Sequence, residues 1–172
     1  RQIEDGRKVG FIQVRRADLS QVALELREQE DSDAFHDFTH ANVSSDGSFV
    51  AASSEYTKET FLFDAQTGAE LLHLPQHRSN VTASALSPDS RRFAMGGKNG
   101  TIQCYQLYRL PNGTFLEAPQ PLTLQAHAGR VHSVRFVDNQ QLVSCGEDGR
   151  VLAWPLETGR SPRQITKTSA YD

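Results

Sequence analysis

Cysteine and long apolar segments are both scarce in this sequence. Two cysteines, Cys104 and Cys145, occur among 172 residues. They are too few for a disulfide framework, they lack the spacing of metal ligands, and both stand in strand-like surroundings, so we expect two reduced core thiols. No apolar run approaches the roughly 20 residues that a membrane-spanning helix needs, and the first residues lack the apolar segment of a signal peptide. A cytoplasmic protein without a membrane span is therefore expected.

An excess of basic residues is also missing. Lysine and arginine number 18 against 21 aspartates and glutamates, for a net charge of −3. Proteins that bind nucleic acid usually carry a basic excess, so nucleic acid is not expected as a partner. The length corresponds to one domain, at roughly 100–200 residues per domain. The sequence begins with Arg1 rather than methionine, which predicts a processed, tagged or excerpted segment.

Helical periodicity is nearly absent as well. Short runs with alternating or β-branched and aromatic residues recur instead, separated by Gly, Asp, Asn, Ser and Pro, and they predict an all-β fold. The candidate strands are Val9–Val14, Gln21–Leu26, Phe49–Ser53, Thr60–Phe63, Ala69–Leu74, Val81–Leu86, Arg92–Met95, Thr101–Gln106, Val131–Phe136, Gln141–Ser144 and Val151–Trp154. The acidic run Glu28–Asp33 is expected to be a solvated loop, and Leu110–Pro121 an inserted loop or hairpin.

The strands form repeats. A Thr-Gly pair falls four residues after the aromatic residues Phe63 and Trp154, and these two copies lie two periods of about 45 residues apart. An intermediate copy has Asn99-Gly100 six residues before Tyr105, as Asp148-Gly149 stands six residues before Trp154. Such dipeptides are strong hairpin signals. A four-stranded meander repeated every 40–50 residues is typical of a propeller blade.

The last copy carries the fullest pattern, which runs from His127-Ala128-Gly129 through Ser144, Asp148-Gly149 and Trp154 to Thr158-Gly159. It resembles the WD-repeat β-propeller family. In that family a buried His, Ser or Thr, Asp and Trp form a hydrogen-bonded chain that ties the blade together. The resemblance implies this structural network for His127, Ser144, Asp148 and Trp154.

All three copies depart from the family pattern. In the first copy, Tyr56–Glu59 lengthens the turn and no clear His begins the repeat. Pro155 follows Trp154, where the family has Asp. In the middle copy the four matching positions are occupied by His77, Met95, Asn99 and Tyr105, so a degraded network is expected there.

The predicted fold is thus a β-propeller of the WD-repeat type, a partial ring of about three and a half four-stranded blades. Residues 1–33 would hold the outer strands of a preceding blade and an acidic loop. One blade would span 34–76, a second 77–126 with an inserted loop at 107–121, and a third 127–172. Because the family usually closes a larger ring, the remainder is expected from the same or another chain.

Catalytic and metal sites are not expected. The pairs His36/His40 and His73/His77 have the spacing of helical metal ligands, but on a strand such residues lie about 13 Å apart. Ser144, His127 and Asp148 match a hydrolytic triad in type, yet the repeat position assigns them to a buried network. The glycine-rich segment 96–100 lacks the Lys-Ser/Thr ending of a phosphate loop, so no cofactor is expected.

The expected function is that of a non-catalytic protein-interaction or scaffold module, as the resemblance implies. Partner contacts are expected on loops that the repeat does not need, with Tyr56, Tyr108, Arg109 and Phe115 as candidates. Two alternatives remain open at this point: the regulatory sensor domain of a larger multidomain signalling ATPase or protease, and a structural half-propeller completed by a partner chain.

Overall fold

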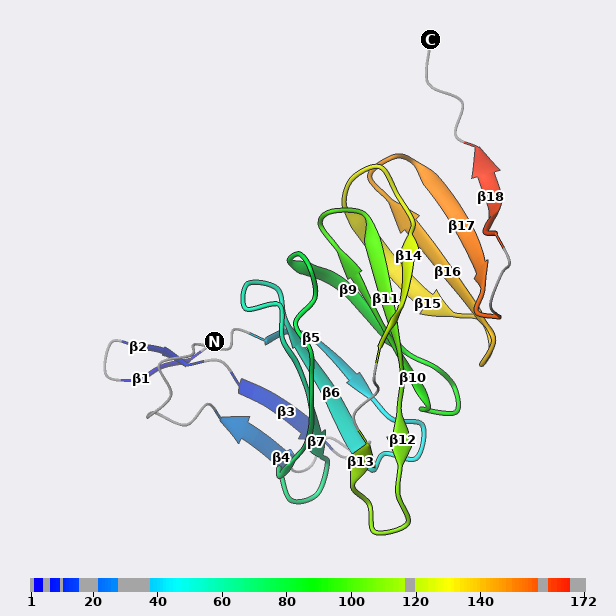
Figure 1. The fold of residues 1–172 in the computed structure, drawn as a ribbon. Coiled ribbons are helices and arrows are strands. Elements are labelled where there is room, and N and C mark those ends of the chain that lie inside the picture. The colour runs from blue at the N-terminus through cyan, green and yellow to red at the C-terminus, as the bar shows by residue number, and fades with distance from the viewer. Residues whose placement is uncertain are drawn as a thin grey trace.

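In the part of the chain that the structure describes, all the strands are antiparallel and no helix occurs. A computed structural model describes residues 2–4, 7–9, 11–15, 22–27, 38–116, 120–157 and 161–167. Three four-stranded sheets make up most of this part, and three two-stranded pairs accompany them. The prediction of an all-β chain is confirmed (Figure 1).

We name the three sheets blades 1, 2 and 3. Blade 1 contains β5 (Phe38–Val43), β6 (Phe49–Ser54), β7 (Thr60–Asp64) and β8 (Glu70–Leu74). Blade 2 contains β9 (Val81–Leu86), β10 (Arg92–Gly97), β11 (Thr101–Gln106) and β14 (Leu122–Gln125). Blade 3 contains β15 (Val131–Phe136), β16 (Gln141–Gly146), β17 (Arg150–Pro155) and β18 (Arg163–Lys167).

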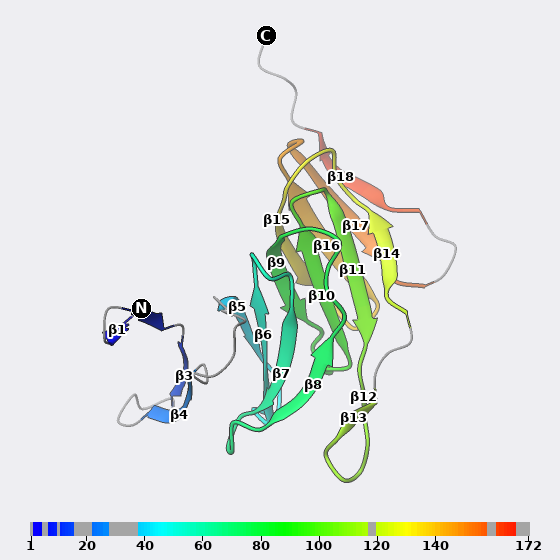
Figure 2. The same ribbon diagram turned by 60° about the vertical axis from the view of Figure 1, so that its left-hand side comes forward.

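The remaining strands form the pairs β1–β2 (Gln2–Glu4 and Arg7–Val9), β3–β4 (Phe11–Arg15 and Val22–Arg27) and β12–β13 (Tyr108–Arg109 and Phe115–Leu116). The last pair is a hairpin inserted between β11 and β14, which pair directly with each other. It extends beyond the sheet of blade 2 in both Figure 1 and Figure 2.

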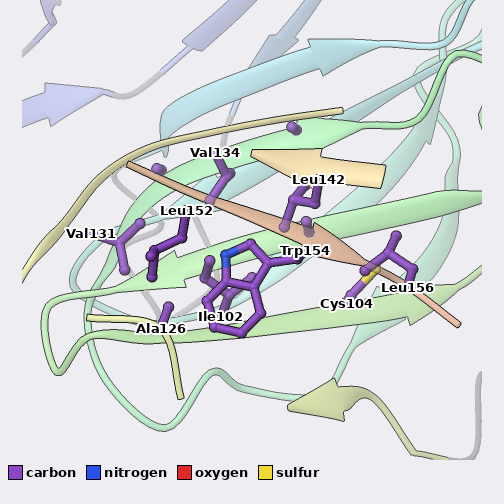
Figure 3. Packing of buried hydrophobic residues seen from close by; sticks show 12 residues of the cluster. Ile102, Cys104, Ala126, Val131, Val134, Leu142, Leu152, Trp154 and Leu156 are labelled. Carbon is purple, nitrogen blue, oxygen red and sulfur yellow. The ribbon is translucent and has the colours of Figure 1, made fainter. Parts of the chain in front are cut away.

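The blades stack through two apolar cores. One core lies between blades 2 and 3, where Trp154, Leu142 and Leu152 of blade 3 meet Ile102 of blade 2 (Figure 3). The other lies between blades 1 and 2 and includes Phe49, Leu62, Phe93, Met95 and Tyr105. Alternate residues of β10 reach opposite cores, because successive strand side chains point to opposite faces. Blade 2 is therefore buried on both sides.

The turns after the first strand of each blade join neighbouring blades. In blade 2, the Ser87 hydroxyl donates to Asp89 Oδ1 at 2.6 Å and accepts from the Arg92 N–H, which closes the turn. The Ser45 N–H of blade 1 donates to Ser90 Oγ at 2.8 Å, and the Asp89 N–H donates to Asn139 Oδ1 of blade 3 at 3.0 Å. The sequence pattern for this turn thus supplies bonds between blades as well as within them.

The sequence-based strands differ from the structure mainly at blade edges. β5, β14 and β18 were not among the candidates. The candidate Val9–Val14 corresponds to β3 but begins too early, because β2 ends at Val9 and β3 begins at Phe11. Both cysteines are free thiols, as predicted. Cys104 is buried, but Cys145 is only half-buried and so is not a full core residue. The acidic run Glu28–Asp33 lies outside the described residues.

Candidate functional site

Four side chains of blade 3 meet in one hydrogen-bonded chain. His127 precedes β15, Ser144 lies on β16, Asp148 lies in the turn between β16 and β17, and Trp154 lies on β17. Trp154 Nε1 donates to Ser144 Oγ at 2.9 Å, Ser144 Oγ lies 2.8 Å from His127 Nε2, and His127 Nδ1 lies 2.8 Å from Asp148 Oδ1. The structure therefore brings together the four residues that the repeat pattern selects.

The direction of the chain follows from its ends. The indole N–H can only donate and an ionised carboxylate can only accept. The Ser144 hydroxyl consequently accepts from Trp154, and His127 Nδ1–H donates to Asp148. In the neutral imidazole this leaves Nε2 as an acceptor, to which the Ser144 hydroxyl donates. A fully satisfied network of this kind links three strands of a blade otherwise held by apolar contacts.

The Asp148 carboxylate is held in its ionised form. Burial alone would raise its pKa, but the Ala128 N–H, the Arg150 guanidinium and His127 all bond to it and lower the pKa well below its usual range. The Arg150 side chain contributes through Nε at 2.8 Å and through a second guanidinium nitrogen at 2.6 Å. The carboxylate thus joins the turn to the segment that leads into β15.

A glycine makes room for the imidazole. A Cβ at Gly146 would lie 2.5 Å from His127 Cγ, which is closer than carbon atoms approach. Gly97 has the same role in blade 2, where a Cβ would lie 2.3 Å from His77 Cε1. The sequence signal for both was a Gly next to the hairpin turn, and composition alone did not reveal its purpose.

Blade 2 lacks most of this network. His77 Nδ1 lies 2.9 Å from the Ser79 carbonyl, and Ser79 Oγ in turn donates to Asn99 Oδ1 at 3.0 Å. At the position of Ser144 stands Met95, and the buried His77 Nε2 has no hydrogen-bond partner. Burial lowers the pKa of His77, against a smaller raising effect of the Ser79 carbonyl. The ring is therefore held neutral and only half satisfied.

The triad-like combination in blade 3 presents no accessible nucleophile. Ser144 is 1% exposed, and its hydroxyl is shared between the indole and the imidazole. Nucleophilic catalysis requires a hydroxyl that can reach a substrate. The geometry fits the structural role that the repeat position implies.

The histidine pairs do not gather metal ligands. His36 lies outside the described residues, and His40 lies on β5. His73 stacks on Phe61 with ring centroids 4.2 Å apart and lies 3.6 Å from Glu59, while His77 is in the network of blade 2. Within the described ranges, no three His, Cys, Asp or Glu side chains form a group that could hold a metal.

The four candidate contact residues divide into two kinds. Tyr56 and Tyr108 are exposed, with 67% and 52% of their surfaces accessible. Phe115 is buried against Phe49, with ring centroids 5.2 Å apart, so its ring packs the core rather than offering a free surface. The sequence could not show this because Phe49 lies in another blade.

Arg109 fastens the hairpin to blade 1. Its guanidinium donates to Ser48 Oγ at 2.6 Å, lies 3.7 Å from Asp46 and sits 5.7 Å from the centre of the Phe115 ring. Hydrogen bonds from Ser44 and Ser48 lower the pKa of Asp46 to about 2, so the carboxylate stays ionised. The Arg109 side chain is thus largely engaged in contacts within the protein.

A groove lies between the hairpin and the turns of blades 1 and 2. Its volume is about 480 Å³, and its lining includes Phe49, Tyr108, Leu110, Phe115 and Leu116. Tyr108, Leu110 and Leu116 are exposed. The lining also includes polar and charged side chains from the turns and from the hairpin, so the groove is mixed in character. Its apolar part, beside exposed aromatic and aliphatic side chains, can accept an apolar side chain of another segment.

Blades of this form, stacked around their first strands, define a segment of a β-propeller. A family model described as "WD domain, G-beta repeat" matches residues 68–106 and 119–155. The two matched segments, which include β8–β11 and β14–β17, support assignment of the chain to the WD40-repeat family. The solved structure of the RRP9 WD40 repeats shares the fold, with a TM-score of 0.59 and 22% identity over 76% of this chain and 37% of that chain.

Curated relatives match part of the chain. It is 34% identical to Protein HIR1 of Kluyveromyces lactis, over 52% of this chain and 12% of that protein. It is 29% identical to the target of rapamycin complex subunit wat1 of Schizosaccharomyces pombe, over 66% of this chain and 34% of the relative. The chain thus spans about a third or less of these relatives. In the part of the chain that the structure describes, no helix has the length and apolar character needed to cross a membrane.

Proposed function

We propose that this chain is a non-catalytic module that binds a protein or peptide partner and forms part of a larger propeller. Relatives such as the wat1 subunit are described as members of complexes, which supports an interaction role. The observation that carries the proposal is the β12–β13 hairpin, because blade 2 is complete without it. A rigid scaffold that displays an extra, fastened hairpin is a common way of placing a binding surface.

The hairpin and its groove suit an apolar partner segment. Tyr108 and Leu116 flank the groove with half of their surfaces exposed, and Leu110 lies between them in the chain. Aromatic and aliphatic side chains next to a pocket are typical anchors of protein interfaces. Arg109 and Phe115 support the proposal indirectly, since they hold the hairpin in place.

Paired surface variants test this role. The double variant Tyr108→Ser, Leu116→Ser removes the proposed anchors, and Val43→Ser, Ile165→Ser removes two similarly exposed apolar residues elsewhere. Affinity purification with quantitative mass spectrometry should show proteins that wild type and control retain and the hairpin variant loses. Equal profiles for the two variants would remove the hairpin as a partner site.

The proposal that this chain forms part of a larger propeller rests on a difference in burial between the second strands of the three blades. β6 is buried at every position and β10 at all but Arg92, whereas β16 alternates between buried and half-buried residues. On β16, Leu142 and Ser144 face blade 2, so Val143 and Cys145 lie on the opposite, half-exposed face. An additional blade would cover this face, from the same chain or from a partner.

Thiol labelling tests the covering of this face. Burial raises the pKa of Cys104 to about 12, so this thiol should stay unreactive and serve as an internal control. Cys145 should react in the isolated chain and become protected in the longer protein or in a complex. Light scattering on the same samples distinguishes the two sources, since completion by a partner chain raises the mass in solution. Equal reactivity of Cys145 in all samples would contradict a covering blade.

A further inference from the structure

The first strands of the three blades enclose a second pocket, separate from the hairpin groove. β9 lies between β5 and β15 (Figure 1). All three strands contribute residues to a pocket of about 300 Å³. This volume lies at the lower end of the range for small-ligand pockets. The residues that surround it are Thr39, His40, Ala41, Asn42, Thr82, Ala83, Ser84, His132, Ser133 and Arg135.

The same backbone irregularity occurs at this pocket in every blade. The pairing of the first and second strands shifts by one residue, which leaves Thr39, Thr82 and His132 as the extra residues of β5, β9 and β15. A bulge bends its strand and redirects the side chains beside it. Both the extra residue and the one after it therefore line the pocket in each blade.

The pocket carries positive and no negative charge. Arg135 is its one permanently charged side chain, and its lining includes no Asp or Glu, although the chain as a whole has a net charge of −3. Glu55, which acts electrostatically on His40, is itself paired with Arg130 at 3.4 Å. Such a lining favours an anion over a cation or an apolar group.

Several donors of blade 3 are available to a ligand. Arg135 donates from one guanidinium nitrogen to the Val134 carbonyl at 2.9 Å and approaches the Ser84 carbonyl at 3.5 Å, and it has no carboxylate partner within the described ranges. His132 and Arg135 are exposed, and Ser133 is half-buried between them. In the described part of the chain, neither the His132 ring nor the Ser133 hydroxyl has a hydrogen-bond partner.

The side chains of Asn42 and Thr82 in the walls of the pocket, by contrast, are already held by hydrogen bonds. Asn42 Nδ2 donates to Ser84 Oγ at 2.7 Å between blades 1 and 2, and Thr82 Oγ1 donates to the Val131 carbonyl at 2.6 Å between blades 2 and 3. These bonds hold the three strands at a set spacing. A preorganised set of donors binds an anion with little loss of side-chain freedom.

We propose that this pocket binds a phosphate group, with Arg135 as the main contact and His132 and Ser133 as additional donors. A guanidinium presents paired N–H groups that match two oxygens of a phosphate, and an imidazole and a hydroxyl can reach the others. The phosphate belongs either to a free small molecule or to a phosphorylated side chain. The site is independent of the hairpin and of its proposed partner.

Titration of the full chain with inorganic phosphate tests the proposal. At constant ionic strength, we expect saturable NMR shifts of the His132 ring and of β15 amides. Arg135→Gln should weaken binding by about tenfold or more, since a charge-assisted bidentate contact is lost. Arg163→Gln is the matched control, because it removes an exposed arginine from the outer strand of the same blade and should leave the affinity unchanged.

Three results would overturn the proposal: no saturable shift, shifts away from β15, or equal weakening by the two arginine variants, which would indicate general charge attraction. His132→Ala provides a second variant should Arg135→Gln unfold, and it should weaken binding several-fold. Titration with O-phosphoserine beside inorganic phosphate distinguishes the sources. Tighter binding of O-phosphoserine would identify a phosphorylated side chain, and tighter binding of phosphate a free small molecule.

Discussion

Blades 2 and 3 show how one repeat can be stabilised in two different ways. In blade 3 the hydroxyl, imidazole, carboxylate and indole are all satisfied, and Trp154 packs over the junction with blade 2. In blade 2 the equivalent histidine keeps one nitrogen without a partner, and Met95 and Tyr105 fill the space with apolar packing. Burial on both faces compensates blade 2 for the lost bonds. Blade 3, which has one half-exposed face, depends more on its network.

Removal of the tryptophan should have the largest effect. Trp154→Ala deletes a buried ring and leaves Ser144 without its donor, at a cost of about 3–5 kcal/mol in the free energy of unfolding. Tyr105→Ala should cost less, because the Tyr105 hydroxyl makes only a 3.3 Å bond to the Pro75 carbonyl. Urea denaturation measures both, and equal costs would contradict the contrast between the blades.

A methyl group at the glycine beside His127 should have the next largest effect. Gly146→Ala places a Cβ against the ring, so overpacking and the loss of network bonds should together cost about 2–4 kcal/mol. The matched variant Gly97→Ala also displaces a histidine, but one with a single engaged nitrogen. The His127 Nδ1 proton signal should disappear in Gly146→Ala and persist in Gly97→Ala. Its persistence in both would show that the ring tolerates the methyl group.

Loss of the shared hydroxyl should have a smaller effect. Ser144→Ala removes the one hydroxyl that the His127 and Trp154 nitrogens share, and we expect this loss to cost about 1–3 kcal/mol in total. Met95→Leu alters the same position of blade 2 and should cost less than about 1.5 kcal/mol, because volume is conserved and His77 already lacks this bond. Thermal unfolding distinguishes the two variants. A larger loss of stability in Met95→Leu than in Ser144→Ala would contradict the assignment of the intact network to blade 3.

A change of pH should have the smallest effect on the free energy of unfolding. It should also distinguish blade 2 from blade 3, because the group that titrates differs between them. Burial lowers the pKa of His77 below its usual 6.5, so the unfolded chain takes up the proton first and stability is lost as the pH falls below about 6.5. Asp148 has a lowered pKa, so its contribution is present at neutral pH and lost only as the pH falls below about 3.8.

Single-residue variants show which group causes the loss of stability below about pH 6.5. Between about pH 7 and pH 5, His77→Gln should flatten the decline in unfolding free energy. His40 is shifted in the same direction by burial, so His40→Gln measures its share separately. An unchanged slope in His77→Gln would show that His77 does not contribute.

The sequence predicted the buried parts of the fold better than the edges. Middle strands such as β6 and β10 are buried on both faces and therefore contain continuous apolar or small residues. β5 and β18 lie at opposite edges of their blades. Half of the residues of β5 and most of those of β18 are polar, so their signal was too weak to detect. Turn residues gave the repeat period and, through it, the four network positions.

The candidate contact surface was harder to predict. Phe115 and Arg109 stood out as unusual loop residues, but their contacts with Phe49 and Ser48 connect parts of the chain that are distant in sequence. The pocket between the first strands was missed altogether. It depends on the bulges at Thr39, Thr82 and His132, and these follow from strand pairing rather than from composition.

The hydrogen bonds between successive turns have a consequence for recognition. Ser45 is bonded to Ser90, and Asp89 to Asn139, so each blade limits the rotation of the next. Loops on different blades are therefore held at fixed distances from one another. A partner that contacts two of these loops gains the second contact with little additional loss of entropy, and one whose own contact points are spaced differently cannot use both.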